Sequence, residues 1–237
     1  MDNETNFTTS LSIRYSSDGF SLCINDTDNN IVLRKETRHS NTETGIESFT
    51  AFVDQALTLN TNANKTEVCF ESERYTLSPA GLFNLSELLN IIEFQHSSLP
   101  ETEYILQQNE LKAHNIVLAF IIETAIYDVI NSRLDNCIIK HHLTDVIEDA
   151  INQHSHLRCL VRKNKIDLIL IINNKLVCCN TYAYTTNEDI LYHILNMKRT
   201  LNTELDNLQT IVRTEFDQQG LEQVLSIHIT KLDFKKT

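Results

Sequence analysis

The stretch Leu11-Ser-Ile-Arg-Tyr-Ser-Ser-Asp-Gly-Phe-Ser-Leu-Cys-Ile24 decides the fold. Apolar side chains recur through residues 11–17 and again through 20–26, and Ser17-Asp18-Gly19 separates the two runs. An Asp-Gly pair between such runs is typical of a β-hairpin with a type I′ turn, because both residues tolerate a positive φ. We therefore predict two antiparallel strands joined at Asp18 and Gly19.

A third strand and a helix are predicted to follow this hairpin. The polar segment Asp26-Thr-Asp-Asn-Asn30 indicates a turn, and the apolar residues after it predict a strand over 31–36. Thr44-Gly-Ile-Glu47 has the spacing of a capping box, in which Thr44 is the N-cap and Glu47 reaches back. Apolar residues then repeat at helical spacing from Ile46 to Leu57.

The same order of elements returns in the second half of the chain. Three strands are predicted there over Leu157–Arg162, Ile166–Ile172 and Lys175–Tyr184, followed by a helix over Asn187–Leu201 that Thr186 caps. The turn at Asn164 follows Asp18 by 146 residues, and Thr186 follows Thr44 by 142. A duplicated strand-strand-strand-helix unit predicts an α/β protein of two lobes.

The remaining segments complete each lobe. We predict strands at 66–71, 104–111, 115–122 and 136–140, and helices at 123–134 and 143–153, the last capped by Thr144. Another helix is expected to open at Ser78-Pro79, with the proline in its first turn. Near the end of the chain we expect a strand at 208–213, a short helix at 214–223 and a strand at 224–232. The first lobe would span residues 1–150, and a shortened second lobe residues 151–237.

Composition bounds the protein class. The chain has 237 residues, of which 41% are hydrophobic and 22% charged, as in globular domains. Its apolar runs, of which Ile116–Ile122 is among the longest, are too short to span a bilayer. The polar and acidic start, Met1 to Asn6, does not resemble a secretory signal, so a cytoplasmic location is expected. A net charge of −12 argues against a nucleic-acid partner.

The six cysteines are predicted to be reduced, buried thiols. None forms a Cys-x-x-Cys pair, and the adjacent Cys178 and Cys179 would point to opposite faces of a strand. Zinc and disulfides are therefore not expected.

The chain also resembles known proteins. The order of elements is similar to that of the actin-like ATPase superfamily, whose ribonuclease-H-like lobes each repeat a three-strand meander, a helix and strand-helix units. More closely, the chain resembles a domain-of-unknown-function family of Bacteroidetes bacteria, and more distantly the cytoplasmic actin-like proteins of pilus and secretion machines. The resemblance covers residues 10 to 215 and rests on Leu11-Ser-Ile13, Asp18-Gly-Phe-Ser21, Tyr75-Thr-Leu-Ser-Pro79, Leu82-Phe83, His141-His142, Asn180-Thr-Tyr-Ala-Tyr184 and Asp189-Ile-Leu-Tyr192.

The resemblance implies a place where ATP and magnesium would bind. Actin-like ATPases hold phosphates with one hairpin turn from each lobe, which points to Asp18, Gly19 and Ser21 in the first turn and to Asp167 beside the second. The second turn, Asn164-Lys-Ile-Asp167, contains no glycine, and Gly220 stands alone where the superfamily has a glycine-rich adenine-binding segment. These departures predict a degenerate member that no longer hydrolyses ATP.

Other chemistries find less support in the residues. A two-metal nuclease needs convergent strand carboxylates, whereas Asp26 and Asp28 lie in a turn. His141-His142 and His154-x-His156 lack a matching pair at zinc spacing, so structural histidines are expected. No GxSxG nucleophile elbow is present. We expect no catalytic and no metal-binding residue.

Two surfaces could serve a ligand or a partner. The helix from Asn187 carries Ile190, Tyr192, His193 and Met197, an apolar arc wide enough either for burial or for partial use as a docking face. The sequence favours burial, and leaves open whether Tyr182 and Tyr184 pack in the core or line a ligand cleft.

The expected function is that of a non-enzymatic cytoplasmic binding or scaffold protein with an unidentified protein partner, no nucleic acid and no membrane span. Self-association is left open. The alternative is a nucleotide-binding switch or ATPase that uses Asp18, Gly19, Ser21 and Asp167.

Overall fold

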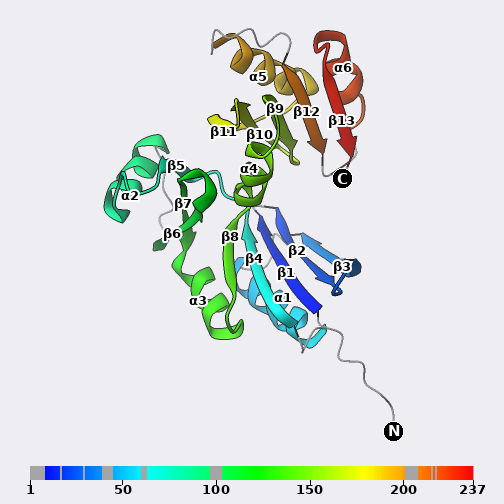
Figure 1. The fold of residues 1–237 in the computed structure, drawn as a ribbon. Coiled ribbons are helices and arrows are strands. Elements are labelled where there is room, and N and C mark those ends of the chain that lie inside the picture. The colour runs from blue at the N-terminus through cyan, green and yellow to red at the C-terminus, as the bar shows by residue number, and fades with distance from the viewer. Residues whose placement is uncertain are drawn as a thin grey trace. The chain divides into compact units, whose positions relative to one another are not determined.

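The computed structural model describes residues 9–16, 18–28, 30–38, 45–59, 63–96, 103–200, 208–214, 216 and 218–236. The chain divides into two compact units, residues 1–144 and 145–237, and each is described by itself (Figure 1). No helix of the described part is long and apolar enough to cross a membrane.

The first unit is built on a five-stranded sheet. Its strands are β1 (Thr9–Ser16), β2 (Gly19–Asn25), β3 (Ile31–Arg38), β4 (Ala63–Phe70) and β8 (Ile138–His141), in the order β3-β2-β1-β4-β8. β1, β2 and β3 form an antiparallel meander, whereas β4 and β8 run parallel to β1. This is the meander that the alternation around Asp18-Gly19 predicts.

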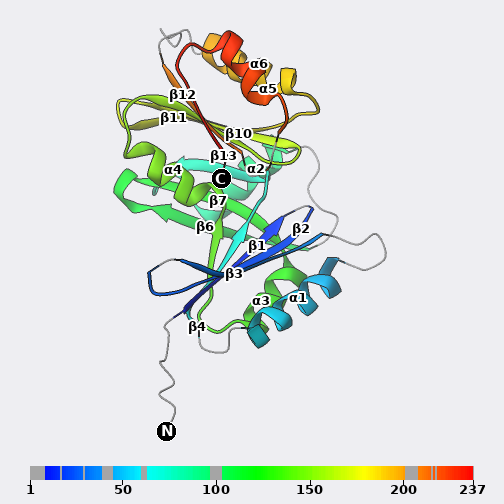
Figure 2. The same cartoon turned by 90° about the vertical axis from the view of Figure 1, so that its right-hand side faces the viewer.

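One face of this sheet is apolar and covered by two helices. Helices α1 (Gly45–Leu59) and α3 (Thr124–Arg133) lie side by side on that face (Figure 2). The buried side chains between sheet and helices include Leu11, Ile13, Leu22, Phe49, Phe52, Val53, Val68, Ile126 and Ile130. Alternation along each strand puts the other residues on the opposite face, which is polar.

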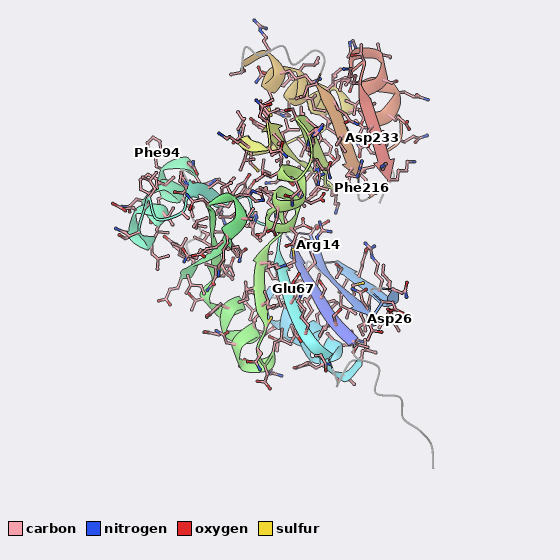
Figure 3. The ribbon with its side chains drawn as sticks, viewed as in Figure 1. Arg14, Asp26, Glu67, Phe94, Phe216 and Asp233 are labelled. Atoms are coloured by element: carbon pink, nitrogen blue, oxygen red, sulfur yellow. The ribbon has the colours of Figure 1, made fainter. Side chains whose placement is uncertain are left out.

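The polar face carries ion pairs between neighbouring strands. Arg14 on β1 pairs with Glu71, just beyond β4, and Lys140 on β8 lies 3.3 Å from Glu67 on β4. Figure 3 labels Arg14 and Glu67. These side chains are half-buried, and each pair joins a residue of one strand to the neighbouring strand on this face.

A second, three-stranded sheet lies within the first unit. Its order is β5 (Tyr75–Pro79), β7 (Ile116–Glu123), β6 (Tyr104–Leu111), all antiparallel. Helix α2 (Leu85–Gln95) buries Leu88 and Ile92 against Val117, Ala119 and Ile121 of β7. A short 3-10 turn, η1 (Lys112–His114), leads from β6 into β7.

The predicted start of α2 was wrong. Pro79 ends strand β5, and the helix begins six residues later. Its N-cap is Asn84, whose side chain accepts a hydrogen bond from the Glu87 backbone while Glu87 Oε2 accepts one from the Asn84 backbone. A complete capping box outweighs the weaker preference for proline at the first helical position.

The second unit repeats the larger sheet. Its strands are β9 (His156–Val161), β10 (Lys165–Ile172), β11 (Lys175–Ala183), β12 (Gln209–Thr214) and β13 (Leu232–Lys236). Their order is β11-β10-β9-β12-β13, with antiparallel pairing in the meander and parallel pairing beyond it. Order and direction match the first sheet strand for strand, which confirms the duplicated α/β architecture.

Helices cover the second sheet as well. Helices α5 (Asn187–Thr200) and α6 (Leu221–His228) pack on one face over a continuous apolar core. On the other face, Arg158 of β9 reaches Val146 O and Asp149 in α4 (Leu143–Ile151). The second unit is the shorter one: its described residues contain no counterpart of the three-stranded sheet, although all five strands of the larger sheet are present.

The predicted N-terminal caps of the helices differ in outcome. Thr186 and Asp189 form the expected capping box at α5, with the Asp189 N–H donating to Thr186 Oγ1 and the Thr186 N–H to Asp189 Oδ2. Thr144 does not cap α4, since it is the second residue of that helix and its hydroxyl donates to Asn109 Oδ1. The box predicted at Thr44 lies outside the described residues.

The C-terminal prediction was also wrong. Residues 214–223 were expected to be a helix and 224–232 a strand, but the helix is Leu221–His228 and the strand starts at Leu232. Leu221, Leu225 and Ile229 are buried at helical spacing, whereas Ile227 is 77% exposed. Burial at a four-residue spacing therefore outweighs the apparent alternation of this segment.

Candidate functional site

The first predicted phosphate turn is a tight hairpin. Ser16 pairs with Gly19 across it, and the Ser16 hydroxyl lies 2.7 Å from Asp18 Oδ1 and 2.9 Å from Gly19 O. Asp18 is exposed. Gly19 has φ 152°, a conformation that side-chain-bearing residues rarely adopt, so glycine is required there for the turn itself.

Ser21 lies on β2, two residues beyond this turn. It is half-buried and sits opposite Arg14 on β1 and Glu36 on β3, on the polar face of the sheet. The hairpin thus brings Asp18, Gly19 and Ser21 into one neighbourhood, as the sequence predicts. The bond between Ser16 and Asp18 is one that an ordinary hairpin turn makes.

Asp167, the candidate of the second unit, is fully buried and already bonded. Arg162 Nε lies 2.8 Å from Asp167 Oδ2, and Arg162 Nη2 lies 3.0 Å from Oδ1. Thr181, opposite Asp167 on β11, donates its hydroxyl to Oδ1 at 2.6 Å. This is a bidentate guanidinium–carboxylate pair, the strongest geometry such a pair adopts.

The turn beside this pair is closed by a tyrosine. Arg162 N–H donates to Lys165 O across the two-residue turn that joins β9 to β10. The Tyr184 hydroxyl donates to Arg162 O at 2.6 Å and lies 3.1 Å from Lys163 O, and Tyr184 N–H donates to Asn164 O. Burial raises the pKa of Tyr184 to about 12, so the phenol stays a donor at neutral pH.

These residues do not fit a magnesium-nucleotide. A carboxylate that binds Mg²⁺, directly or through water, needs oxygen lone pairs facing outward. The Asp167 oxygens instead face Arg162 and Thr181 at zero exposure, and the guanidinium cancels the negative charge. Lys165, the first residue of β10, has its pKa lowered by burial, with Asp167 acting in the opposite direction.

Side-chain hydrogen bonds hold the segment before Gly220, where the resemblance to actin-like ATPases would place an adenine-binding loop. Gly220 has φ 79° and is the N-cap of α6. Before it, Gln218 Nε2 donates to Asn187 Oδ1 at 2.7 Å, and Asn187 Nδ2 donates to Gln219 O at 3.0 Å. A Cβ at Gly220 would lie 3.7 Å from Asn187 Nδ2, an ordinary contact. The positive φ explains the glycine at this position, because the space around it would accept a Cβ.

Sequence reasoning missed Arg162, Thr181 and Asn187. The sequence does contain a signal for the pairing of Arg162 with Asp167. Asp167 lies opposite Leu160, and Arg162 follows Leu160 by two residues. Both charged side chains therefore lie on one face of the hairpin. Opposite charges on a diagonal of one sheet face predict an ion pair. Asn187 carried no such signal, because its partners come from a segment more than thirty residues away.

Of the histidines that the sequence singled out, His141 and His142 are buried and bonded within the first unit. His141 is buried against Tyr75 and Phe120, accepts the Leu143 N–H at Nδ1, and so donates from Nε2 to Ser72 O. His142 lies 3.3 Å from Phe70 O. Among the described residues no group of three His, Cys, Asp or Glu side chains is placed to hold a metal ion.

The side-chain amide of Asn109 holds strand β8, which ends at His141. Asn109 on β6 donates from Nδ2 to Ile139 O at 2.9 Å, and its Oδ1 accepts the His141 N–H at 2.8 Å. The Thr144 hydroxyl donates to the same oxygen. Asn109 thereby fastens β8 and the start of α4 to the smaller sheet.

The carboxylates in the turn between β2 and β3 do not support the nuclease alternative. Asp26 accepts hydrogen bonds from the backbone of Asp28 and from both the backbone and side chain of Asn30. The Asn30 side chain is the main cause that lowers the pKa of Asp26. Asp26 therefore stabilises the turn between β2 and β3.

Helix α5 mixes core and surface residues. Ile190, Ile194 and Met197 are buried, whereas Tyr192 is 62% exposed. His193 stacks on Tyr182 with ring centroids 4.5 Å apart and donates from Nε2 to Ala183 O at 3.2 Å. Tyr184 is buried in the core, and Tyr182 packs against it. Both tyrosines thus contribute to packing in the second unit.

Comparison with known proteins places this fold. Residues 1–226 match the family described as protein of unknown function (DUF3822). A Bacteroides thetaiotaomicron protein with an actin-like ATPase fold and unknown function is 22% identical, with a TM-score of 0.78 over 99% of this chain and 93% of its own. The search of curated proteins found no match.

More distant structures share the fold alone. The ethanolamine utilization protein EutJ of Carboxydothermus hydrogenoformans is 7% identical, with a TM-score of 0.55 over 95% of this chain and 84% of its own. A chain of the PilM-PilN type IV pilus biogenesis complex is 10% identical, with a TM-score of 0.52 over 95% of this chain and 88% of its own. The architecture is therefore that of the actin-like ATPase fold, as the order of elements predicts.

Proposed function

Because this chain belongs to the DUF3822 family and has an actin-like ATPase fold, we propose that it is a non-enzymatic cytoplasmic binding or scaffold protein. Its partner is another protein, and it neither binds nor hydrolyses a nucleotide. A fold does not fix a function, so the proposal rests on the site.

The ion pair of Arg162 and Asp167 carries this proposal. It occupies the only acidic position that the resemblance offers in the second unit, and it leaves that carboxylate buried and neutralised. Recruiting Asp167 to a magnesium-nucleotide would strand a buried guanidinium, which costs about 3–5 kcal/mol. The tied segment at Asn187 and Gln218 supports the same conclusion.

A binding role also agrees with the kind of protein that shares the fold. One similar structure comes from a complex of two pilus biogenesis proteins, PilM and PilN. At 10% identity this likeness indicates what the fold can do rather than which partner it takes.

The test is thermal unfolding of the full chain with and without millimolar Mg-ATP and Mg-ADP. A native-state ligand at a hundredfold excess over Kd stabilises by about 2.7 kcal/mol. We expect no change in Tm with either nucleotide. A rise of several degrees that Asp18→Ala abolishes, and that Asp28→Ala in the neighbouring turn leaves intact, would overturn the proposal in favour of a nucleotide switch.

A further inference from the structure

Strand β3 forms an open edge of the five-stranded sheet in the first unit. Among the described residues it pairs with β2 alone, at the end of the order β3-β2-β1-β4-β8 (Figure 1). Its first residues are unusually exposed for large apolar side chains: Ile31 is 61% exposed, Val32 63% and Leu33 36%. Unpaired backbone groups beside such side chains are a template for another strand.

The opposite edge of the same sheet does not offer this. There, β8 has only four residues, and the Asn109 side chain already bonds Ile139 O and the His141 N–H. Of the two edges, β3 is thus the one at which the sheet can be extended.

The charge along β3 is opposite in sign to that of the whole chain. Residues 34–38 read Arg-Lys-Glu-Thr-Arg, so the strand carries a net charge of +2 while the protein carries −12. Arg34 pairs with Glu36 at the surface at 3.0 Å, and Lys35 donates to Gln55 of α1 on the other face. A local positive strip on an acidic protein attracts an acidic segment and repels basic ones.

A second copy of β3 is a poor occupant. Residues opposed in a symmetric antiparallel pair lie on the same face of the continued sheet. Because side chains alternate between faces, one residue of β3 must then lie opposite the same residue of the second copy. In the two registers with the longest overlap, that residue is Arg34 or Lys35. Like charges directly opposite one another destabilise such a pair. The register centred on Lys35 also sets Arg34 opposite Glu36, but two whole chains that each carry a net charge of −12 repel each other.

We propose that β3 binds an extended segment of a partner protein that adds to the sheet as an antiparallel strand. The segment carries two acidic residues followed by three β-branched apolar residues. In that order its carboxylates lie opposite Lys35 and Arg34, and its apolar side chains lie opposite Leu33, Val32 and Ile31. Main-chain hydrogen bonds supply the affinity and these side chains the selectivity. This inference rests on the proposed binding function and names the class of partner.

The first experiment uses the fluorescein-labelled peptide Thr-Thr-Glu-Glu-Val-Ile-Val and the full-length chain, with binding followed by fluorescence anisotropy. We expect saturable binding that weakens as salt is raised. The reversed peptide Val-Ile-Val-Glu-Glu-Thr-Thr has the same composition, but no antiparallel register sets its acids opposite Lys35 and Arg34 and its apolar residues opposite Leu33, Val32 and Ile31 at the same time. It should therefore bind more weakly by about tenfold. Equal binding of the two peptides would overturn the antiparallel assignment.

Charge exchange provides the decisive control. The double variant Arg34→Glu/Lys35→Glu should lose the acidic peptide by about tenfold or more and gain the peptide Thr-Thr-Lys-Lys-Val-Ile-Val. Val32→Asp should weaken binding of the acidic peptide, whereas Ile227→Asp, at an exposed apolar position of α6, should not. Circular dichroism melts of each variant show whether the fold is retained, and the gain of the lysine peptide counts only for a variant that is folded.

The outcomes separate this inference from the proposed function. Absence of peptide binding together with absence of a nucleotide shift overturns the β3 site and leaves the binding role in place. A rise in Tm with nucleotide that Asp18→Ala abolishes and Asp28→Ala leaves intact overturns the proposed function, whatever the peptide does. Sedimentation that shows a dimer abolished by Val32→Asp would overturn the partner assignment in favour of a second copy of this chain.

Discussion

Arg162 and Asp167 meet across the two-residue turn between β9 and β10, and each carboxylate oxygen faces a different guanidinium nitrogen, at 2.8 and 3.0 Å. Both side chains are buried, Asp167 completely. The pair therefore fixes the hairpin of the second unit at the position where its resemblance to actin-like ATPases places phosphate contacts.

Removing one member of the Arg162–Asp167 pair should lower the free energy of unfolding far more than replacing both members. Asp167→Asn leaves a buried guanidinium without its counter-ion, and we expect it to lower the free energy of unfolding by about 3 kcal/mol or more. Arg162→Met/Asp167→Leu, which replaces the pair with apolar groups, should cost much less than Asp167→Asn alone. Urea unfolding of the two variants measures both values, and equal losses would show that the pair has no such coupling.

The start of α2 offers a comparison between two residues. Asn84→Ala removes the cap that satisfies the Glu87 N–H and should destabilise the first unit by about 1 kcal/mol. Pro79→Ala, at the end of an edge strand and outside the helix, should change stability less. Thermal unfolding followed by circular dichroism distinguishes them, and a larger loss for Pro79→Ala would restore the helix start predicted from the sequence.

His156 should make the protein sensitive to mild acid. Its Nδ1 donates to His154 O at 2.6 Å, its Nε2 is buried without a hydrogen-bond partner, and burial lowers its pKa below 6.5. The neutral ring is favoured in the folded state, so stability is fully present above pH 6.5 and is lost as pH falls toward the lower folded pKa.

Urea unfolding at pH 7 and pH 5 tests this dependence. We expect the chain to lose stability between the two values, and His156→Gln to reduce that loss because an amide does not titrate. His154→Gln is the matched control, since His154 bonds His156 through its backbone carbonyl, which the substitution keeps. An unchanged loss in His156→Gln would place the titration on another group.

Local patterns predicted the two meanders, because hairpin turns and strand alternation are contained within a few neighbouring residues. Local patterns gave the wrong element where contacts with residues distant in the sequence determine the structure. Val224 to Ile229 reads as a β-rich run, yet Leu221, Leu225 and Ile229 bury on one helical face against the second sheet. Pro79 reads as a helix start, yet pairing with Ile116 keeps it in a strand.

The candidate site divides along the same line. Asp18, Gly19 and Ser21 are close in sequence, and the structure brings them together in one hairpin. The state of Asp167 depends on Arg162 and on Thr181, which arrives from the next strand. Charge and spacing indicate where a carboxylate lies, whereas its availability depends on partners that only the folded sheet assembles.

The Asn109 amide has a consequence for how the first sheet can grow. A neighbouring parallel strand would give an N–H to Ile139 O and take the N–H of His141, and the Asn109 side chain makes both of these bonds. The Asn109 side chain thus makes the two hydrogen bonds that one residue of a sixth strand would make. The sheet is terminated at β8 and extendable at β3, so any assembly by strand addition is unidirectional.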